Sequence, residues 1–133
     1  MTSKVIYKGY LRTEATHIHS GSTIITDAPS DNKGKGEAFS PTDLVATALA
    51  SCMLTIMGIK ADEIDINIEG ASAKVKKIMA AGPRRIAQVI IDINIPIQAD
   101  DKTKNILEKV ALTCPVEKSL TDSMIRDVKF IWG

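Results

Sequence analysis

The run from Leu44 to Ile59 has no formal charge over sixteen residues, and it constrains the fold more than any other segment. Ser40-Pro41-Thr42-Asp43 precedes it. Ser40 provides an N-cap hydroxyl, Pro41 suits the first helical position, and Asp43 can bond back to the cap. We expect such an apolar helix to be buried nearly all round. Because it is shorter than the ~20 residues that a membrane crossing needs, the sequence predicts a central core helix and no membrane partner.

Strand patterns flank this helix on both sides. Residues 3–11 and 15–28 are rich in β-branched residues, which predicts two or three antiparallel strands with a turn at Ser20-Gly21. Alternating apolar residues over 64–75 and 89–97 predict a hairpin of two long strands, turning at residues 81–84. The remaining elements are a helix capped by Asp100, a short helix from Cys114-Pro115 to about Leu120, and a last strand with Val128, Phe130 and Trp132.

The element order places strands and helices in separate runs, which is typical of an α+β fold and not of a doubly wound α/β sheet. With 133 residues, the chain has the length of a single domain, residues 1–133. The N-terminal residues contain no continuous apolar run, so no secretory signal is visible. We therefore expect a cytoplasmic protein.

Charge and aromatic content argue against nucleic acid as a partner. The formal net charge is only +1, and the chain has one Trp, two Tyr and two Phe. Such a balance creates no field that would concentrate a polyanion, and few rings are available to stack on bases.

The two cysteines, Cys52 and Cys114, are the first functional clue. A reducing cytoplasm favours free thiols or a transient redox pair over a permanent disulfide. Cys52 lies in the apolar helix, too far from its N-terminus for the helix dipole to act on it, so a thiolate there needs a cation from elsewhere. Cys114 precedes Pro115 at a helix N-cap, where backbone N–H groups can stabilise an anion. Local physics therefore predicts that Cys114 is the more acidic thiol.

Few other residues are candidates for a functional site. Five basic residues could supply the cation for Cys52: Arg12, Lys33, Lys35, Arg84 and Arg85. His17 and His19 would point to one face of a strand, but no third or fourth ligand is marked nearby. The sequence therefore indicates neither a metal nor a cofactor.

Two segments resemble the OsmC/Ohr family of thiol-dependent peroxidases. They are Phe39-Ser-Pro-Thr-Asp-Leu-Val-Ala-Thr-Ala-Leu-Ala-Ser-Cys52-Met53 and Cys114-Pro115-Val116. The resemblance extends over essentially the whole chain, including the element order and the separation of the two cysteines. It implies antiparallel sheets around a long central helix, in an intertwined homodimer with each active site at the subunit interface.

The resemblance also implies a chemistry for the two thiols. Cys52 matches the cysteine that attacks the peroxide, and Cys114 matches the resolving cysteine. Cys52 would become a sulfenic acid, which Cys114 would convert to a disulfide. The substrate would be an organic hydroperoxide, with hydrogen peroxide the poorer one, and a dithiol reductant, such as a lipoyl group, would close the cycle in oxidative stress defence.

One position departs from the family pattern. Family peroxidases usually hold a Glu directly after the Pro of the helix-start motif, paired with an Arg that orients the thiolate, whereas this chain has Thr42. Asp43 and Glu37 are the candidate replacements for that carboxylate, and Arg12 is the candidate arginine. The expected catalytic set is therefore Cys52, Cys114, Arg12 and Asp43.

Two other functions compete with the peroxidase hypothesis. A divergent family member without peroxidase activity would bind a small apolar ligand in the cleft of the dimer interface. A purely structural dimer would use both cysteines as core filler, and its thiols would react only on unfolding.

Overall fold

The computed structural model describes all residues from Met1 to Gly133, which form two compact units, Met1–Val45 and Ala46–Gly133. We describe each unit by itself. The element order is three strands, a long helix, a two-stranded hairpin, two helices and a final strand, as the sequence predicted.

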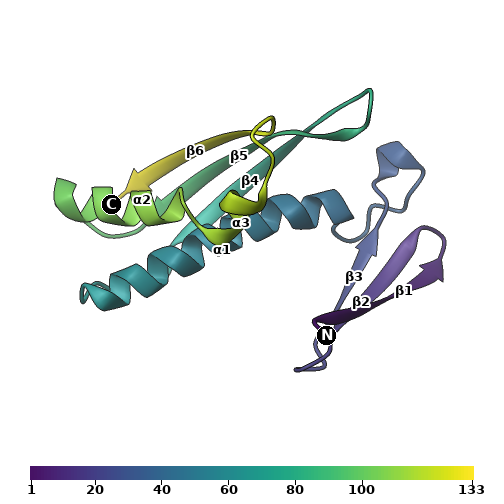
Figure 1. The fold of residues 1–133 in the computed structure, drawn as a ribbon, viewed down its shortest axis with the longest axis horizontal. Helices are drawn as coiled ribbons and strands as arrows, with labels where there is room; N and C mark the ends of the chain where they lie inside the picture. The colour runs from purple at the N-terminus through teal and green to yellow at the C-terminus, as the bar shows by residue number, and fades with distance from the viewer. The chain divides into compact units, whose positions relative to one another are not determined.

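The N-terminal unit is built on an antiparallel sheet of three strands, β1 (Ser3–Gly9), β2 (Arg12–His17) and β3 (Thr23–Asp27), in the order β1-β2-β3 (Figure 1). The sequence did not indicate the turn between β1 and β2. Tyr10 and Leu11 form this turn with φ values of 53° and 61°. Two successive left-handed residues match the twist of a tight hairpin, and they make Arg12 the first residue of β2.

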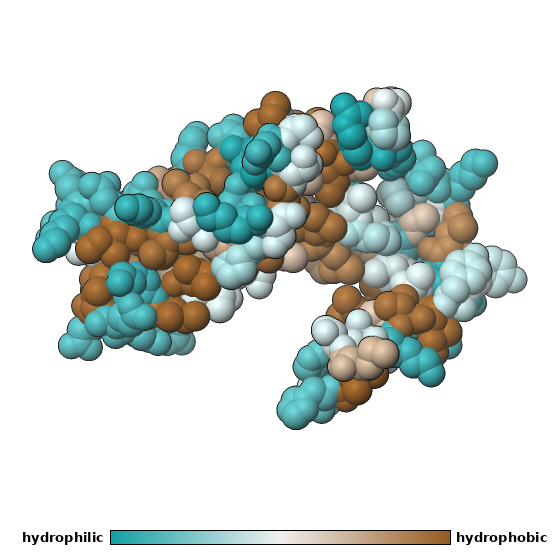
Figure 2. Space-filling view, in the orientation of Figure 1, coloured by the Kyte–Doolittle hydropathy of each residue, from teal (hydrophilic) through white to brown (hydrophobic).

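The N-terminal unit buries almost no apolar side chain. Its buried residues are Thr26, Asp27 and Ser40. Five large apolar side chains on its strands are exposed: Val5, Ile6, Tyr7, Ile24 and Ile25. Brown apolar surface is accordingly visible on the β1–β3 part of the molecule in Figure 2. A small sheet needs an apolar face packed against something else to be stable, so this unit has no sufficient core of its own.

Helix α1 (Pro41–Glu63) begins where the sequence predicted. The Asp43 N–H donates to Ser40 Oγ at 3.1 Å, and the Ser40 N–H donates to an Asp43 carboxylate oxygen at 3.0 Å, which is a capping box. The helix has 23 residues, long and apolar enough to cross a membrane. The length argument against a membrane span was therefore wrong. The helix is nevertheless a core helix, because one of its faces packs into the apolar core.

Only one face of α1 is buried within the chain. The buried residues recur every three or four positions: Ala46, Leu49, Ala50, Met53, Met57 and Ala61. Val45 and Ile59 are exposed, as are Ser51 and Thr55. The expectation of burial nearly all round was therefore wrong for the single chain, because the core supplied by this chain covers one side of the helix.

The second unit contains the sheet β4-β5-β6, formed by β4 (Ser72–Ala80), β5 (Arg85–Ile95) and β6 (Ile125–Trp132). Two helices, α2 (Asp101–Ala111) and α3 (Pro115–Ser119), connect β5 to β6. β5 pairs antiparallel with β4 but parallel with β6. The α+β fold with two sheets and a long helix is confirmed, although this sheet is mixed and not antiparallel throughout. The helical crossover explains the difference, because it returns the chain to the start of β6 in the direction of β5.

The core lies on one face of this sheet. Alternate residues of β5 are fully buried: Val89, Ile91, Ile93 and Ile95. They form one apolar cluster with the buried face of α1 and with Leu107 and Ala111 of α2. Figure 1 shows α1 running alongside the sheet. Burying each large aliphatic side chain stabilises the fold by roughly 1.5–3 kcal/mol, so this cluster holds α1, α2 and the sheet together.

The predicted strand over residues 64–75 begins later than its alternation suggested. Ile64, Ile66 and Ile68 pack against the core but lie in the loop before β4. The Ile66 N–H donates to the Ala61 carbonyl at 2.8 Å, which closes the end of α1 instead of joining a sheet ladder. The alternation of apolar residues therefore correctly predicted that these side chains pack against the core, but it wrongly predicted a strand.

Candidate active site

Cys114 is held at the start of α3 by the local chain geometry. A tight turn follows α2, in which the Cys114 N–H donates to the Ala111 carbonyl at 3.3 Å. Cys114 has an extended backbone, with φ −67° and ψ 158°, as expected for a residue before proline. Pro115 occupies the first turn of α3, where its missing N–H costs nothing. The turn and the proline together place the Cys114 side chain in the core, with 1% of its surface exposed.

The structure brings the two cysteines together. Cys52 lies on α1 next to the fully buried Met53, and its own side chain is partly exposed. The Cys52 side chain packs against the apolar cluster that contains Cys114, and it lies close enough to raise the pKa of the Cys114 thiol. Both thiols are free. Residues far apart in the sequence thus form a reduced dithiol in the second unit, with one thiol accessible and one enclosed.

The expected acidity of Cys114 is wrong. Burial raises the pKa of the Cys114 thiol above its ordinary value, and the neighbouring Cys52 raises it further. The N–H groups of Glu117 and Val116 act in the opposite direction, as the N-cap argument predicted, but burial outweighs them. Cys114 is therefore a protonated thiol at neutral pH.

Arg12 forms a bidentate ion pair in the N-terminal unit. Its guanidinium donates to both carboxylate oxygens of Asp27, at 2.7 and 2.9 Å. The Asp27 side chain is 1% exposed, whereas Arg12 is 31% exposed. The hydrogen bond from Arg12 lowers the pKa of Asp27, and the bond to Asp27 raises the pKa of Arg12. Arg12 is therefore a fixed cation on a carboxylate that the sequence analysis did not single out.

Glu37 and Asp43, the two carboxylates that the sequence suggested as partners for Arg12, make other contacts. Glu37 Oε2 is 4.0 Å from an Arg12 nitrogen, and the Glu37 backbone N–H donates to Asp27 at 3.2 Å. Asp43 accepts the Ser40 N–H as part of the capping box. Asp27 is thus the carboxylate that holds Arg12 most closely.

The remaining basic candidates have contacts of their own. Lys35 Nζ lies 5.4 Å from the centre of the Tyr10 ring. Arg85 donates to the carbonyl oxygens of Ala81 and Pro83, both at 3.0 Å, and so closes the β4–β5 turn. Lys33 has a left-handed backbone after the short helix η1 (Ser30–Asn32). None of these contacts resembles the fixed guanidinium of Arg12.

The histidines lie near one another on the β2–β3 turn. His17 Nδ1 is 2.6 Å from Ser20 Oγ. The rings of His17 and His19 are 6.5 Å apart and nearly perpendicular. No group of three His, Cys, Asp or Glu side chains could hold a metal ion here or elsewhere in the chain.

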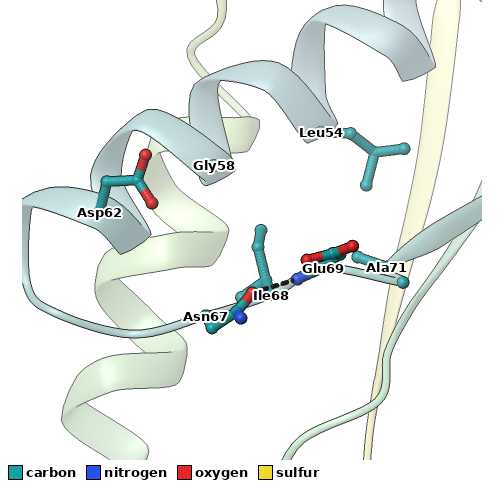
Figure 3. A pocket seen from close by; sticks show the side chains of 8 residues that line it. Leu54, Gly58, Asp62, Asn67, Ile68, Glu69 and Ala71 are labelled. Atoms are coloured by element: carbon teal, nitrogen blue, oxygen red, sulfur yellow. Dashed lines mark hydrogen bonds between the residues drawn. The ribbon is translucent and has the colours of Figure 1, made fainter.

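An open hollow of about 350 Å³ lies beside the C-terminal half of α1 (Figure 3). It is lined by Leu54, Gly58, Asp62, Asn67, Ile68, Glu69, Gly70 and Ala71. The Glu69 N–H donates to Asn67 Oδ1 at 2.8 Å along its floor. Neither cysteine lines this hollow. The hollow is therefore separate from the dithiol.

Asp27 is the residue that the sequence analysis missed. The register of β2 and β3 could have identified it, because Arg12 and Asp27 are directly paired across these two strands. A two-residue turn at Ser20-Gly21 would have placed Arg12 opposite Pro29. The turn begins earlier, where the Gly21 N–H donates to the His17 carbonyl.

The chain matches known proteins over both cysteines. The family described as OsmC-like protein matches residues 34–128. A crystal structure from Psychrobacter arcticus 273-4 is 56% identical, with a TM-score of 0.93, and the match covers 100% of this chain and 96% of that chain. That protein is provisionally described as an osmotic stress induced and detoxification response protein.

More distant solved structures share the fold. An organic hydroperoxide resistance protein OsmC from Legionella pneumophila is 19% identical, with a TM-score of 0.73 and coverage of 100% of this chain and 97% of that chain. An OsmC like protein from Mycoplasma pneumoniae is 17% identical, with a TM-score of 0.81 and coverage of 98% and 94%. A search of curated proteins found no match.

Proposed function

Because the chain belongs to the OsmC-like protein family, we propose that it is a cysteine-based, thiol-dependent peroxidase that reduces organic hydroperoxides and, less well, hydrogen peroxide. The observation that carries the proposal is the dithiol, in which a partly exposed Cys52 and a buried Cys114 belong to the same packed cluster. Relatives that share the fold are named for organic hydroperoxide resistance, which supports this substrate class.

The proposed reaction uses the two thiols in sequence. The Cys52 thiolate attacks the terminal peroxide oxygen, the O–O bond breaks, and the alkoxide leaves as an alcohol after taking up a proton. Cys52 is then a sulfenic acid. The Cys114 sulfur attacks the Cys52 sulfur, the S–O bond breaks, and the oxygen leaves as water while a disulfide forms. Cys52 suits the first step because it is accessible, and Cys114 suits the second because it is adjacent and enclosed.

Arg12 is the proposed cation for the Cys52 thiolate, a role assigned from the family resemblance. Its fixed geometry supports the assignment, because Asp27 holds the guanidinium on two hydrogen bonds and leaves further N–H donors available. Arginine presents these donors in a planar fork, which lysine lacks. We further propose that Asp27 takes the place of the carboxylate that Thr42 does not provide, while Asp43 caps α1.

The peroxidase proposal is tested by the oxidation state of the two cysteines. Reduced protein is mixed with one equivalent of cumene hydroperoxide or of hydrogen peroxide, quenched over time with a thiol alkylator, and analysed by intact mass and peptide mapping. We expect a Cys52–Cys114 disulfide that forms faster with the organic peroxide. Two thiols that remain fully alkylatable would contradict the proposal and would favour a ligand-binding role for the fold.

The active species is proposed to be a homodimer of one domain, residues 1–133. The N-terminal unit exposes Val5, Tyr7 and Ile24 and has no apolar core, and α1 exposes Val45 and Ile59. A second copy that covers these side chains would remove a large apolar area from water, which is the main source of stability in obligate dimers. We also propose a cytoplasmic location and a dithiol reductant.

Light scattering is expected to give twice the chain mass of 14.4 kDa. The variant Ile24→Asp should shift the population towards monomer, because it would bury an unpaired carboxylate in the interface. Lys76→Asp is the matched control, since it changes charge at an exposed position of β4. A wild-type protein that remains monomeric at micromolar concentration would contradict the dimer.

A further inference from the structure

Helix α3, which begins directly after Cys114, is poorly anchored by apolar contacts. It has five residues, and none of them is fully buried. Its first backbone hydrogen bond joins the Lys118 N–H to the Cys114 carbonyl at 3.0 Å. A single short turn of helix has little intrinsic stability in water, so another interaction must hold α3 in place.

Arg126 provides that interaction from the neighbouring sheet. Its guanidinium donates to both oxygens of Glu117 in α3, with N···O distances of 2.6 to 3.0 Å. The third nitrogen of the guanidinium, Nη1, donates to the Thr121 carbonyl at 2.6 Å and to the Met124 carbonyl. Arg126 and Glu117 are only 14% and 19% exposed. One side chain therefore ties α3 and both ends of the following loop to β6.

The position of Arg126 on β6 makes it a rigid anchor. It pairs in register with the fully buried Val89 of the central strand β5. Because side chains alternate along a strand, Arg126 shares its face with Val128, Phe130 and Trp132, which pack against the core. The Arg126 guanidinium is therefore on the face of β6 that points towards α3 and away from solvent.

Glu117 connects this anchor to the resolving thiol. Its carboxylate is held by Arg126, while its backbone N–H acts on the Cys114 sulfur. A displacement of Glu117 would therefore move the segment that keeps Cys114 against Cys52. The closure of a disulfide depends steeply on such positioning, because the two sulfurs must meet in a narrow geometry.

We propose that the Arg126–Glu117 pair is a latch that positions Cys114 against Cys52 and so sets the efficiency of disulfide formation. Both are positioning residues, because they act through the segment that carries Cys114. The inference rests on the proposed Cys52–Cys114 disulfide, but it does not depend on which oxidant produces that bond.

Glutathione provides the test without any peroxide. The protein dithiol and oxidised glutathione exchange to the protein disulfide and two molecules of reduced glutathione, so that S–S bonds and electrons balance. The equilibrium constant has units of concentration and measures how effectively the two protein thiols are held together. It is obtained anaerobically, by acid quenching, alkylation and intact mass.

We expect Glu117→Gln and Arg126→Gln each to lower this constant by about tenfold, because the latch that preorganises Cys114 is lost. The double variant should fall no further than either single variant, because the two residues act as one unit. Arg126→Lys, which keeps the charge but loses the fork, should be intermediate and remains informative if a glutamine variant does not fold.

Trp132→Phe is the matched control on the same strand. It removes the hydrogen bond from Trp132 Nε1 to Glu108, at 3.0 Å, and should lower the urea midpoint without changing the constant. Wild-type constants in both glutamine variants would overturn the latch.

Failure of the peroxidase proposal can be distinguished from failure of the latch. If wild-type protein forms the Cys52–Cys114 disulfide in glutathione but shows no peroxide turnover, the peroxidase proposal is contradicted, while a tenfold lower constant in the glutamine variants still supports the latch. Wild-type protein that gives only mixed glutathione disulfides would overturn both the proposed disulfide and the latch.

Discussion

Cys52→Ser should reduce hydroperoxide turnover by about a thousandfold or more, because the attacking sulfur is lost. Cys114→Ser should behave differently. It should release about one alcohol per chain in a first turnover and then stop, because the sulfenic acid on Cys52 has no partner. Rapid-quench measurement of alcohol release, with a sulfenic acid probe, separates the two variants.

Ser51→Ala is the control for this pair, since it changes an exposed hydroxyl on α1 directly beside Cys52. It should keep wild-type rates. A Cys114→Ser variant that turns over at the wild-type rate would show that Cys114 is not the resolving thiol. Equal activity in Cys52→Ser would remove the peroxidase proposal altogether.

Arg12→Ala should lower kcat/KM for an organic hydroperoxide by about a hundredfold, the size of effect seen when one preorganised charge-stabilising group is removed. Arg12→Lys should recover only part of the loss, because an ammonium has no planar fork. Asp27→Asn should cost less than Arg12→Ala, since the cation remains but one of its charged partners is gone. Steady-state kinetics at pH 7 provide the measurement.

Lys35→Ala serves as the control for charge, because Lys35 lies in the same unit and contacts Tyr10. It should have kinetics close to wild type. The opposite result, with Lys35→Ala impaired and Arg12→Ala unaffected, would transfer the role of the cation to Lys35. Circular dichroism of each variant separates loss of the fold from loss of the charge.

Local chemistry was a reliable guide to the elements of the second unit. Asp100 caps α2 through the Thr103 N–H at 2.8 Å, and Pro115 begins α3, as their residue types predict. The alternation in β5 predicted its buried face. These features depend on neighbours in the sequence, so they can be recognised without knowledge of the tertiary structure.

Predictions that required distant contacts were less successful. Alternation placed Ile64, Ile66 and Ile68 in a strand, although only their burial was determined by the pattern. The turn between β2 and β3 begins at His17, earlier than the predicted turn at Ser20-Gly21, so the register of these two strands was missed. Without that register, the pairing of Arg12 with Asp27 could not be found.

The candidate site shows the same division between local and distant effects. The N-cap argument identified the N–H groups that lower the pKa of Cys114, but the sign of the net shift is decided by burial against α1 and the sheet. Similarly, nothing near Glu117 in the sequence identifies Arg126 as its partner. Motif resemblance suggested that the two cysteines act together, and the fold places them in one packed cluster.

The enclosure of Cys114 determines which kind of thiol would reduce a Cys52–Cys114 disulfide most effectively. In a Cys52–Cys114 disulfide, an incoming thiol could reach the Cys52 sulfur more readily, so Cys114 would depart as the leaving group. A thiol with a raised pKa leaves slowly, and from its position it would readily displace a single thiol that had attached to Cys52. A reductant with two linked thiols escapes this reversal, because its second sulfur completes the exchange first. In the proposed cycle, the buried thiol would therefore favour dithiols over single thiols as electron donors.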